Sequence, residues 1–246
     1  MLEVNDLHVR YGGLTALRGV SFTVNAGEIV CLVGANGAGK STALQAIAGG
    51  VVPVRGSIRL DGEELVGRRP EAIARRGVTL VPEGRHVFGT LTVEENLRVG
   101  VAARGDRWTA TSDLDRVMTH FPILRSRRQS GAASLSGGEQ QMLVLARALM
   151  ASPRLMMVDE PSLGLGPMIV DQVYDILLTL RRDSGLTLLI NEQSLQRVLK
   201  RADRLYVIRA GEVQLHKAGQ TEADRPAILN AYFGFDREVG NAGAPQ

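Results

Sequence analysis

The chain has 246 residues, 44% of them hydrophobic and 22% charged, which is the usual balance of a soluble globular protein. A formal net charge of +3 without a long Lys/Arg run argues against a dedicated nucleic-acid-binding protein. The single cysteine, Cys31, excludes an intrachain disulfide and fits a reducing compartment. We expect no signal peptide and, because no apolar run reaches about 18 residues, no membrane-spanning helix.

Strand and helix patterns alternate along the chain, which predicts an α/β fold with a mainly parallel core sheet. Antiparallel strands beside that sheet are expected at 2–9, 17–24 and 57–61. Continuous apolar runs predict buried strands at 28–34, 77–83, 154–160, 186–192 and 204–213. Helices are expected at 39–49, 167–183 and 194–202.

The predicted domain covers residues 1–239 and contains one insertion. From about 91 to 150 the pattern is helical throughout, so we expect an inserted helical subdomain there. Residues 240–246, GNAGAPQ, are expected to form a disordered tail.

A glycine-rich stretch, GANGAGKST at 34–42, lies between a predicted strand and a predicted helix. It matches G-x-x-x-x-G-K-[ST], in which successive backbone N–H groups form a nest for phosphate oxygens and the following helix adds its positive end. Lys40 is expected to reach the β- and γ-phosphates, and the Ser41 hydroxyl is expected to bind Mg²⁺. The predicted phosphate-binding residues are Gly34, Ala35, Asn36, Gly37, Ala38, Gly39, Lys40, Ser41 and Thr42.

Two acidic residues end the apolar run LMMVDE at 155–160. Asp159 suits a direct or water-mediated contact with Mg²⁺, and Glu160 is placed to polarise an attacking water. A strand that ends in two acids is weak evidence by itself, because many strands end in acids. Together with the glycine-rich stretch, it predicts hydrolysis of a nucleoside triphosphate.

A second candidate phosphate site opens the helix predicted within SLSGGEQQMLVLARALMASP at 134–153. Ser136 and Glu139 have the spacing of a capping box. Gly137 and Gly138 are unfavourable in a first helical turn, at roughly 1 kcal/mol each. They fit either an ordinary helix cap or bare N–H groups that admit a phosphate, and the residues alone leave both interpretations open.

These motifs, in this order and over nearly the whole chain, resemble those of the ATP-binding subunits of ABC transporters. The resemblance rests on LSGGEQQ at 135–141 and MMVDEPSLGLGP at 156–167, with the glycine-rich stretch upstream. It implies a head-to-tail dimer in which the Ser136–Gly138 segment contacts the γ-phosphate of ATP held by the other subunit. It also implies that Tyr11 stacks on adenine, the alternative being a half-buried tyrosine at a strand end.

Two positions depart from the pattern of that family. Glu83, in VPEGR, stands where the family usually has a glutamine, and a carboxylate there is expected to bind Mg²⁺ or to hold water. Gln193, in INEQ, stands where the family has a histidine that touches the γ-phosphate. Its amide donates an N–H but cannot shuttle a proton. The expected catalytic residues are Lys40, Glu160 and Gln193, and the expected Mg²⁺ ligands are Ser41, Glu83 and Asp159.

The same departures are similar to those of one subtype, the F-type ATP-binding subunit of branched-chain amino-acid importers, and ILNAYFGF at 228–235 resembles the ending of that subtype. The resemblance implies a second ATP-binding subunit and two membrane-spanning permease subunits, which would dock near GTLTVEEN at 89–96. It also implies a periplasmic solute-binding protein, and a peripheral place for this chain at the cytoplasmic face of the inner membrane. Three alternatives stay open: the ATPase subunit of a urea or amide importer, a non-transport ABC ATPase that acts on nucleic acid or ribosomes, and a nucleotide sensor with weak hydrolysis.

Overall fold

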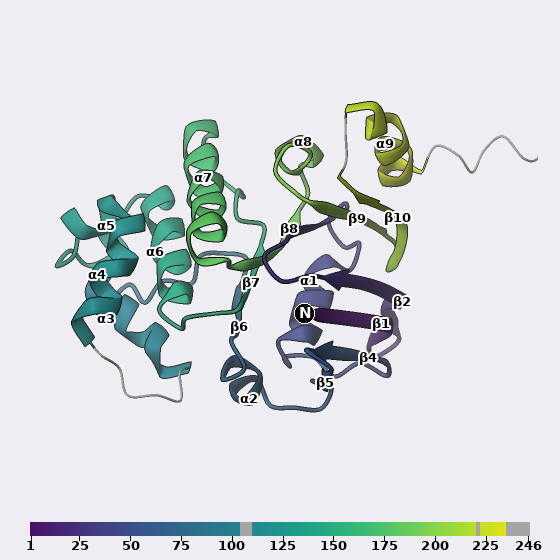
Figure 1. The fold of residues 1–246 in the computed structure, drawn as a ribbon, viewed down its shortest axis with the longest axis horizontal. Coiled ribbons are helices and arrows are strands. Elements are labelled where there is room, and N and C mark those ends of the chain that lie inside the picture. Colours follow the sequence, from purple (N-terminus) through teal and green to yellow (C-terminus); the bar gives the residue numbers. More distant parts are fainter. Residues whose placement is uncertain (104–109, 220–221, 235–246) are drawn as a thin grey trace, which may run out of the picture.

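A six-stranded sheet forms the centre of the computed structural model, which describes residues 1–103, 110–219 and 222–234 (Figure 1). Its strand order is β10-β9-β3-β8-β7-β6, and neighbouring strands are parallel except for β9 and β10. The predicted, mainly parallel core sheet is therefore confirmed. The strands are β3 (Ile29–Val33), β6 (Val78–Val81), β7 (Leu155–Asp159), β8 (Thr187–Glu192), β9 (Arg204–Arg209) and β10 (Glu212–Ala218).

An antiparallel sheet of four strands, in the order β2-β1-β4-β5, flanks the central sheet as expected. Its strands are β1 (Leu2–Tyr11), β2 (Leu14–Val24), β4 (Arg55–Leu60) and β5 (Glu63–Glu64). The buried apolar side chains of this sheet pack in one cluster with helix α1 (Lys40–Ile47) and with one face of the central sheet. This packing places the end of β1 and the start of β2 beside the start of α1.

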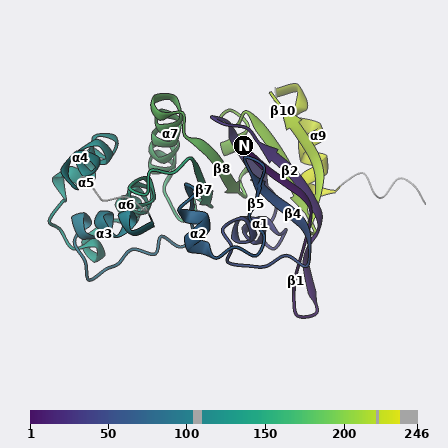
Figure 2. The ribbon, with the colours of Figure 1, turned by 60° about the horizontal axis from the view of Figure 1, so that its bottom comes forward.

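Most of the remaining helices gather at the other end of the molecule. In both views α3 to α6 lie together, opposite the antiparallel sheet, with α7 between them and the central strands (Figure 2). No helix in the described ranges has both the length and the apolar character needed to cross a membrane. The helices are α2 (Pro70–Ala74), α3 (Val93–Val99), η1 (Gly100–Ala103), α4 (Ala110–His120), α5 (Pro122–Ser126), η2 (Ala132–Ser134), α6 (Gly137–Leu149), α7 (Pro167–Ser184), α8 (Leu195–Val198), η3 (Glu222–Asp224) and α9 (Arg225–Phe233).

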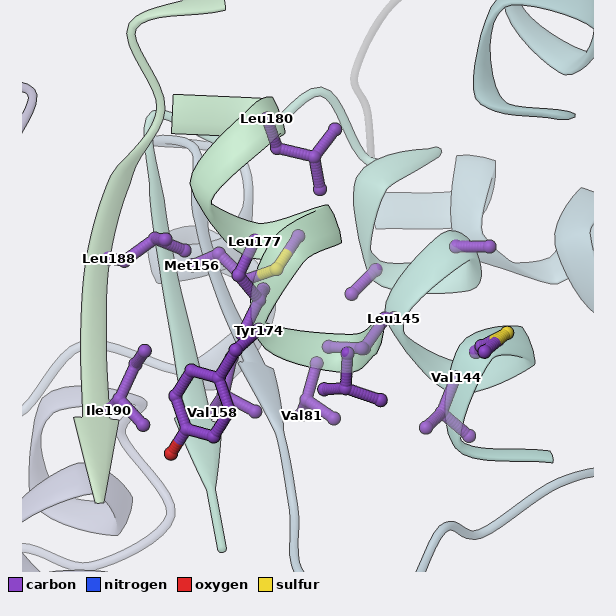
Figure 3. Close-up of a cluster of buried hydrophobic side chains, with 14 of the residues drawn as sticks. Val81, Val144, Leu145, Met156, Val158, Tyr174, Leu177, Leu180, Leu188 and Ile190 are labelled. Carbon is purple, nitrogen blue, oxygen red and sulfur yellow. The ribbon is translucent and has the colours of Figure 1, made fainter. Parts of the chain in front are cut away.

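The central strands are buried on both faces, which explains their uninterrupted apolar sequences. Along β3, Cys31 packs in the core on the side of α6 and α7, whereas its neighbour Leu32 packs on the side of α1. Figure 3 shows the first of these two cores, in which the ring of Tyr174 from α7 lies among Val158 and Ile190. The single cysteine is thus a core residue, and burial raises the pKa of its thiol.

One predicted strand is wrong, because residues 204–213 form a hairpin. β9 ends at Arg209, and β10 runs back antiparallel after a turn at Ala210 and Gly211, whose φ angles are 51° and 80°. Two successive positive φ values are those of a type I′ turn, whose twist suits a two-residue hairpin. Alanine at the first turn position gave no turn signal, since that position usually holds Asn, Asp or Gly.

The chain between α5 and α6 departs from the helix expected throughout 91–150, because it forms turns and only one short helix, η2. There the Val93 N–H donates to the Ser130 carbonyl at 3.0 Å, and the Glu94 N–H donates to the Arg128 carbonyl at 3.1 Å. Residues 127–129 form turns, and the carbonyls of Arg128 and Ser130 satisfy two of the first N–H groups of α3, which have no partner within the helix. Likewise α8 is shorter than the predicted 194–202. The domain limits stay a prediction, and the predicted tail at 240–246 lies outside the described residues.

Parallel pairing brings the carboxyl ends of the central strands to one edge of the sheet. Asp159 of β7 stands opposite Asn191 of β8, and Val33 of β3 stands opposite Glu192. The glycine-rich stretch begins directly after Val33, so it lies at the same edge as the acidic strand ends. In open α/β sheets this edge is where ligands bind.

Candidate active site

The loop between β3 and α1 requires glycine at two positions. A Cβ on Gly34 would lie 2.2 Å from the Ile208 carbonyl oxygen, and a Cβ on Gly39 would lie 2.8 Å from the Ala16 carbonyl oxygen. Gly39 also has a φ of 109°, in the left-handed region. The loop therefore packs its backbone against two neighbouring strands, and the N–H groups that open α1 are left to bind an anion.

Lys40, the first residue of α1, turns back over this loop. Only 5% of it is exposed, and its Nζ donates to the carbonyls of Gly34 at 2.8 Å and Ala35 at 3.3 Å. The same Nζ lies 3.2 Å from Oε1 of Glu160. The two charges expected to handle phosphate and water therefore neutralise each other across the loop.

Glu160 is held in an uncommon backbone conformation. Its φ is 48°, which costs about 1–3 kcal/mol for a residue other than glycine. Its N–H donates to the Asn191 carbonyl at 3.1 Å, and its Oε2 accepts from the Gln193 N–H at 3.2 Å. Burial raises the pKa of the Glu160 carboxyl, while the charge of Lys40 acts in the opposite direction. Strand β8 thus fixes the direction of a carboxylate that is easier to protonate than one in water.

A cleft of about 470 Å³ opens above the glycine-rich loop, a volume within the usual range for small-molecule sites. Tyr11, at the end of β1, and Leu14, at the start of β2, are 48% and 67% exposed at this cleft and offer it an aromatic and apolar surface. The structure therefore brings most of the predicted nucleotide-site residues around one space. The cleft is lined by Tyr11, Leu14, Thr15, Ala16, Asn36, Gly37, Ala38, Gly39, Lys40, Ser41, Thr42, Glu83 and Glu160.

Asp159 lies beside this cleft and contacts the serine expected to share a metal ion with it. Its Oδ1 accepts from the Ser41 hydroxyl at 3.1 Å and from the Asn191 amide at 3.0 Å. No group of three or more His, Cys, Asp or Glu side chains is arranged for a metal within the described residues. A hydroxyl and one carboxylate nevertheless fit Mg²⁺, which takes few protein oxygens and completes its shell with water and phosphate.

The two departures from the family pattern occupy different places. Glu83 is exposed and lines the cleft, two residues after the end of β6. Gln193 is exposed just beyond β8 and does not line the cleft itself, but its backbone N–H contacts Glu160. The structure therefore brings Gln193 to the predicted catalytic acid through its backbone.

The second candidate phosphate site does not reach the cleft in this chain. Ser136 caps α6 and lines a separate cavity of about 580 Å³ beside α5 and α7. The predicted capping box is confirmed: the Glu139 N–H donates to the Ser136 hydroxyl, and the Ser136 N–H donates to Glu139 Oε2 at 2.7 Å, which lowers the pKa of Glu139.

The two glycines after Ser136 have a packing reason that the sequence did not indicate. A Cβ on Gly138 would lie 2.7 Å from Cγ2 of Ile169 on α7, and a Cβ on Gly137 would lie 2.7 Å from the guanidinium of Arg85. Arg85 also donates to the Gly164 carbonyl at 3.4 Å. Packing against α7 therefore favours glycine at position 138, whether or not a phosphate binds there, whereas the flexible Arg85 side chain can move away from position 137.

Sequence reasoning assigned no role to Glu192, which the structure buries completely. Its Oε1 accepts from the Ser162 hydroxyl at 2.5 Å and from the Tyr174 hydroxyl at 2.8 Å, and Oε2 lies 4.0 Å from the Arg197 guanidinium. Figure 3 shows the Tyr174 hydroxyl directed toward the end of β8. This network ties the loop after Glu160 to the tip of β8. The one signal in the sequence that could have indicated this role is an acidic residue at the end of a strand that is predicted to be buried.

Comparison with known proteins identifies relatives over most of the chain. Residues 17–163 match the family model described as ABC transporter. The high-affinity branched-chain amino acid transport ATP-binding protein BraG of Pseudomonas aeruginosa is 45% identical over 234 residues, which cover 95% of this chain and 100% of that protein. The probable branched-chain amino acid transport ATP-binding protein LivF of Archaeoglobus fulgidus is 36% identical over 213 residues, 87% of this chain and 90% of that protein.

A solved structure confirms the predicted fold. The ADP conformation of an ATP-binding cassette of an ABC transporter is similar with a TM-score of 0.84 and 26% sequence identity. The match covers 95% of this chain and 98% of that one. The P-loop core, with its parallel sheet and antiparallel flank, is therefore the fold of this chain.

Proposed function

The chain belongs to the ABC transporter family, and we propose that it hydrolyses ATP to energise the import of branched-chain amino acids through a multi-subunit transporter. The observation that carries the hydrolytic part is the Lys40–Glu160 pair at 3.2 Å on the wall of the cleft. This pair supports the proposal because a lysine suited to bind phosphate and a carboxylate suited to activate water line the same cleft. The transported solute rests on the relatives, which are branched-chain amino-acid transport proteins by name.

In this mechanism, ATP phosphates replace Glu160 as the partner of Lys40. The backbone N–H groups at the start of α1 and the Lys40 ammonium bind the β- and γ-phosphates and offset the charge that builds up during transfer. Glu160, released from Lys40, orients a water in line with the γ-phosphate and accepts its proton. Its raised pKa improves it as a base relative to an exposed glutamate.

The residues beside the cleft fit the supporting roles. Ser41 and Asp159, which already contact each other, would hold Mg²⁺, and Glu83 would bind it directly or through water. The ion, when bound, supplies positive charge to the phosphate oxygens. Tyr11 offers the exposed ring on which adenine stacks, a contact worth about 1–3 kcal/mol. Gln193 serves as a neutral donor to the γ-phosphate.

A second ATP-binding subunit completes the site in this proposal. Ser136, Gly137 and Gly138 lie outside the chain's own cleft, so they are free to contact a nucleotide held by another subunit. The segment after Glu160 is suited to the same interface, because Leu163 of the loop and Met168 of the first turn of α7 are exposed. The head-to-tail arrangement implied by the family would use both surfaces.

We also propose that the chain works at the cytoplasmic face of the inner membrane, bound to two permease subunits. A cavity of about 270 Å³ between β6, α3 and α6 would receive a segment of one permease, and Phe88 and Val99 are exposed beside it. The cavity adjoins the 89–96 stretch predicted to face the membrane subunits. A solute-binding protein on the other side of the membrane would supply the amino acid.

Uptake by whole cells tests the proposal. A strain that lacks this chain should lose uptake of radiolabelled leucine, and the wild-type gene should restore it while Glu160→Gln should not. Restoration by Glu160→Gln would contradict the hydrolytic role. Loss of urea or amide uptake with normal leucine uptake would assign the chain to that importer instead. Normal uptake of all three solutes would favour a non-transport ATPase or a nucleotide sensor.

A further inference from the structure

The last helix of the described chain reaches the catalytic edge of the sheet. Helix α9 packs beside β9 and β10, and its Ile228 is completely buried in the core that includes β8 (Figure 1). An ion pair of 2.9 Å between Lys217 of β10 and Asp224 fixes the start of the helix. The helix is therefore a docked element of the fold.

One side chain of α9 contacts the residue predicted to sense the γ-phosphate. The Tyr232 hydroxyl donates to the backbone carbonyl of Gln193 at 3.2 Å. On its other side, the Gln193 N–H donates to Glu160 Oε2 at 3.2 Å. The backbone of Gln193 is thus held at both ends, by the C-terminal helix and by the predicted catalytic acid.

These two backbone hydrogen bonds matter because the Gln193 side chain has no hydrogen bond of its own within the described residues. Its direction consequently depends on the orientation of its backbone. Burial raises the pKa of Tyr232, and the nearby charge of Glu160 adds to this effect. The phenol accordingly stays a neutral hydrogen-bond donor under working conditions.

We propose that Tyr232 is a positioning residue for ATP hydrolysis, through which the C-terminal helix aims the Gln193 side chain at the γ-phosphate. The inference rests on the proposed function and deepens it. Tyr232 touches no part of the cleft and acts only through the backbone of Gln193. The helix does not merely cover the sheet, and displacing it would slow hydrolysis while leaving ATP bound.

The test uses the complex that co-purifies from membranes with the tagged full-length chain. Tyr232→Phe removes only the hydroxyl, and it should lower the kcat for ATP about 3- to 10-fold while the KM for ATP stays within about twofold. Tyr206→Phe is the matched control, because that hydroxyl bonds the Thr23 backbone in the antiparallel sheet and should leave kcat unchanged. Melting temperatures of both variants verify folding.

A second pair of variants tests the route of the effect. In a Gln193→Ala background there is no side chain left to aim, so Tyr232→Phe should change kcat by less than about twofold. A full additional loss in that background, or a KM that rises in step with the loss of kcat, would overturn the inference. A Tyr232→Phe kcat equal to that of Tyr206→Phe would overturn it too, with the proposed function intact. A wild-type complex without ATPase activity would instead refute the proposed function itself.

Discussion

Replacing Glu160 by glutamine should separate ATP binding from ATP hydrolysis. Glutamine keeps the length and shape of the side chain, so the glycine-rich loop and Lys40 stay in place. The substitution removes one feature that matters for the chemistry, which is the negative charge that takes a proton from water. The variant should therefore bind ATP and fail to turn it over.

The expected sizes follow from the geometry around the carboxylate. General-base catalysis contributes about 10²–10⁴-fold, or roughly 3–5 kcal/mol of barrier, and the variant should lose this much turnover. ATP should bind more tightly, because the removed charge lies 3.2 Å from the Lys40 ammonium that we propose as the phosphate partner. A negative charge about 4 Å from a phosphate makes ATP binding less favourable by about 1 kcal/mol at the dielectric constant of water and by about 4 kcal/mol at that of a protein surface. Without that charge, the affinity for ATP should rise about fivefold or more.

The assay combines ATP titration of the full-length chain with turnover of the complex. Glu212→Gln is the control, because Glu212 is an exposed glutamate on the β9–β10 hairpin, outside the cleft. Turnover within threefold of wild type in Glu160→Gln would refute the role of Glu160 as the base. Weaker ATP binding would refute the idea that Glu160 competes with phosphate for Lys40.

Three further results are expected. The acid limb of the pH profile of kcat/KM for ATP should lie above about pH 4.3, which is the pKa of an exposed glutamate, because burial raises the pKa of Glu160. An acid limb at or below that pH would contradict this. Glu94→Gln should cost about 1 kcal/mol of unfolding free energy in urea at pH 7, since the Arg128 guanidinium at 2.6 Å and a second arginine hold the pKa of Glu94 to about 2. A lowered carboxyl pKa stabilises the fold above about pH 4.3, so the difference from wild type should shrink as the pH falls toward 2, and a constant difference would refute the assignment. Ser162→Ala should lower kcat about 3- to 10-fold at unchanged KM by releasing Glu192, with an unchanged kcat as the contrary result.

The glycine-rich loop was predictable because its chemistry depends on the spacing of residues along the chain. The spacing of GANGAGKST marks the turn and the start of α1 even though strands distant in sequence pack on the loop, and Ser136 and Glu139 cap α6 through local bonds alone. The acids at 159 and 160 were recognisable because they end an apolar run. Local sequence determines these features, so it also reveals them.

Features that depend on distant neighbours were missed. The contact of Lys40 with Glu160 requires β3 and β7 to lie on either side of β8, a strand order that no local pattern specifies. The burial of Glu192 depends on Ser162 and Tyr174, 30 and 18 residues away in the sequence. For the two glycines that follow Ser136, the sequence left an ordinary helix cap and a phosphate site open and gave no sign of packing, because their contacts with Arg85 and Ile169 arise only in the folded chain.

The central claim is that this chain couples ATP hydrolysis to import of branched-chain amino acids. Its most direct test is the ATPase rate of the complete transporter in proteoliposomes, measured against the loaded solute-binding protein. Leucine-, isoleucine- or valine-loaded binding protein should stimulate hydrolysis in the wild type and have no effect in Glu160→Gln. Stimulation by a urea- or amide-loaded binding protein instead would contradict the claim. An ATPase rate that stays the same with every loaded binding protein would contradict it too.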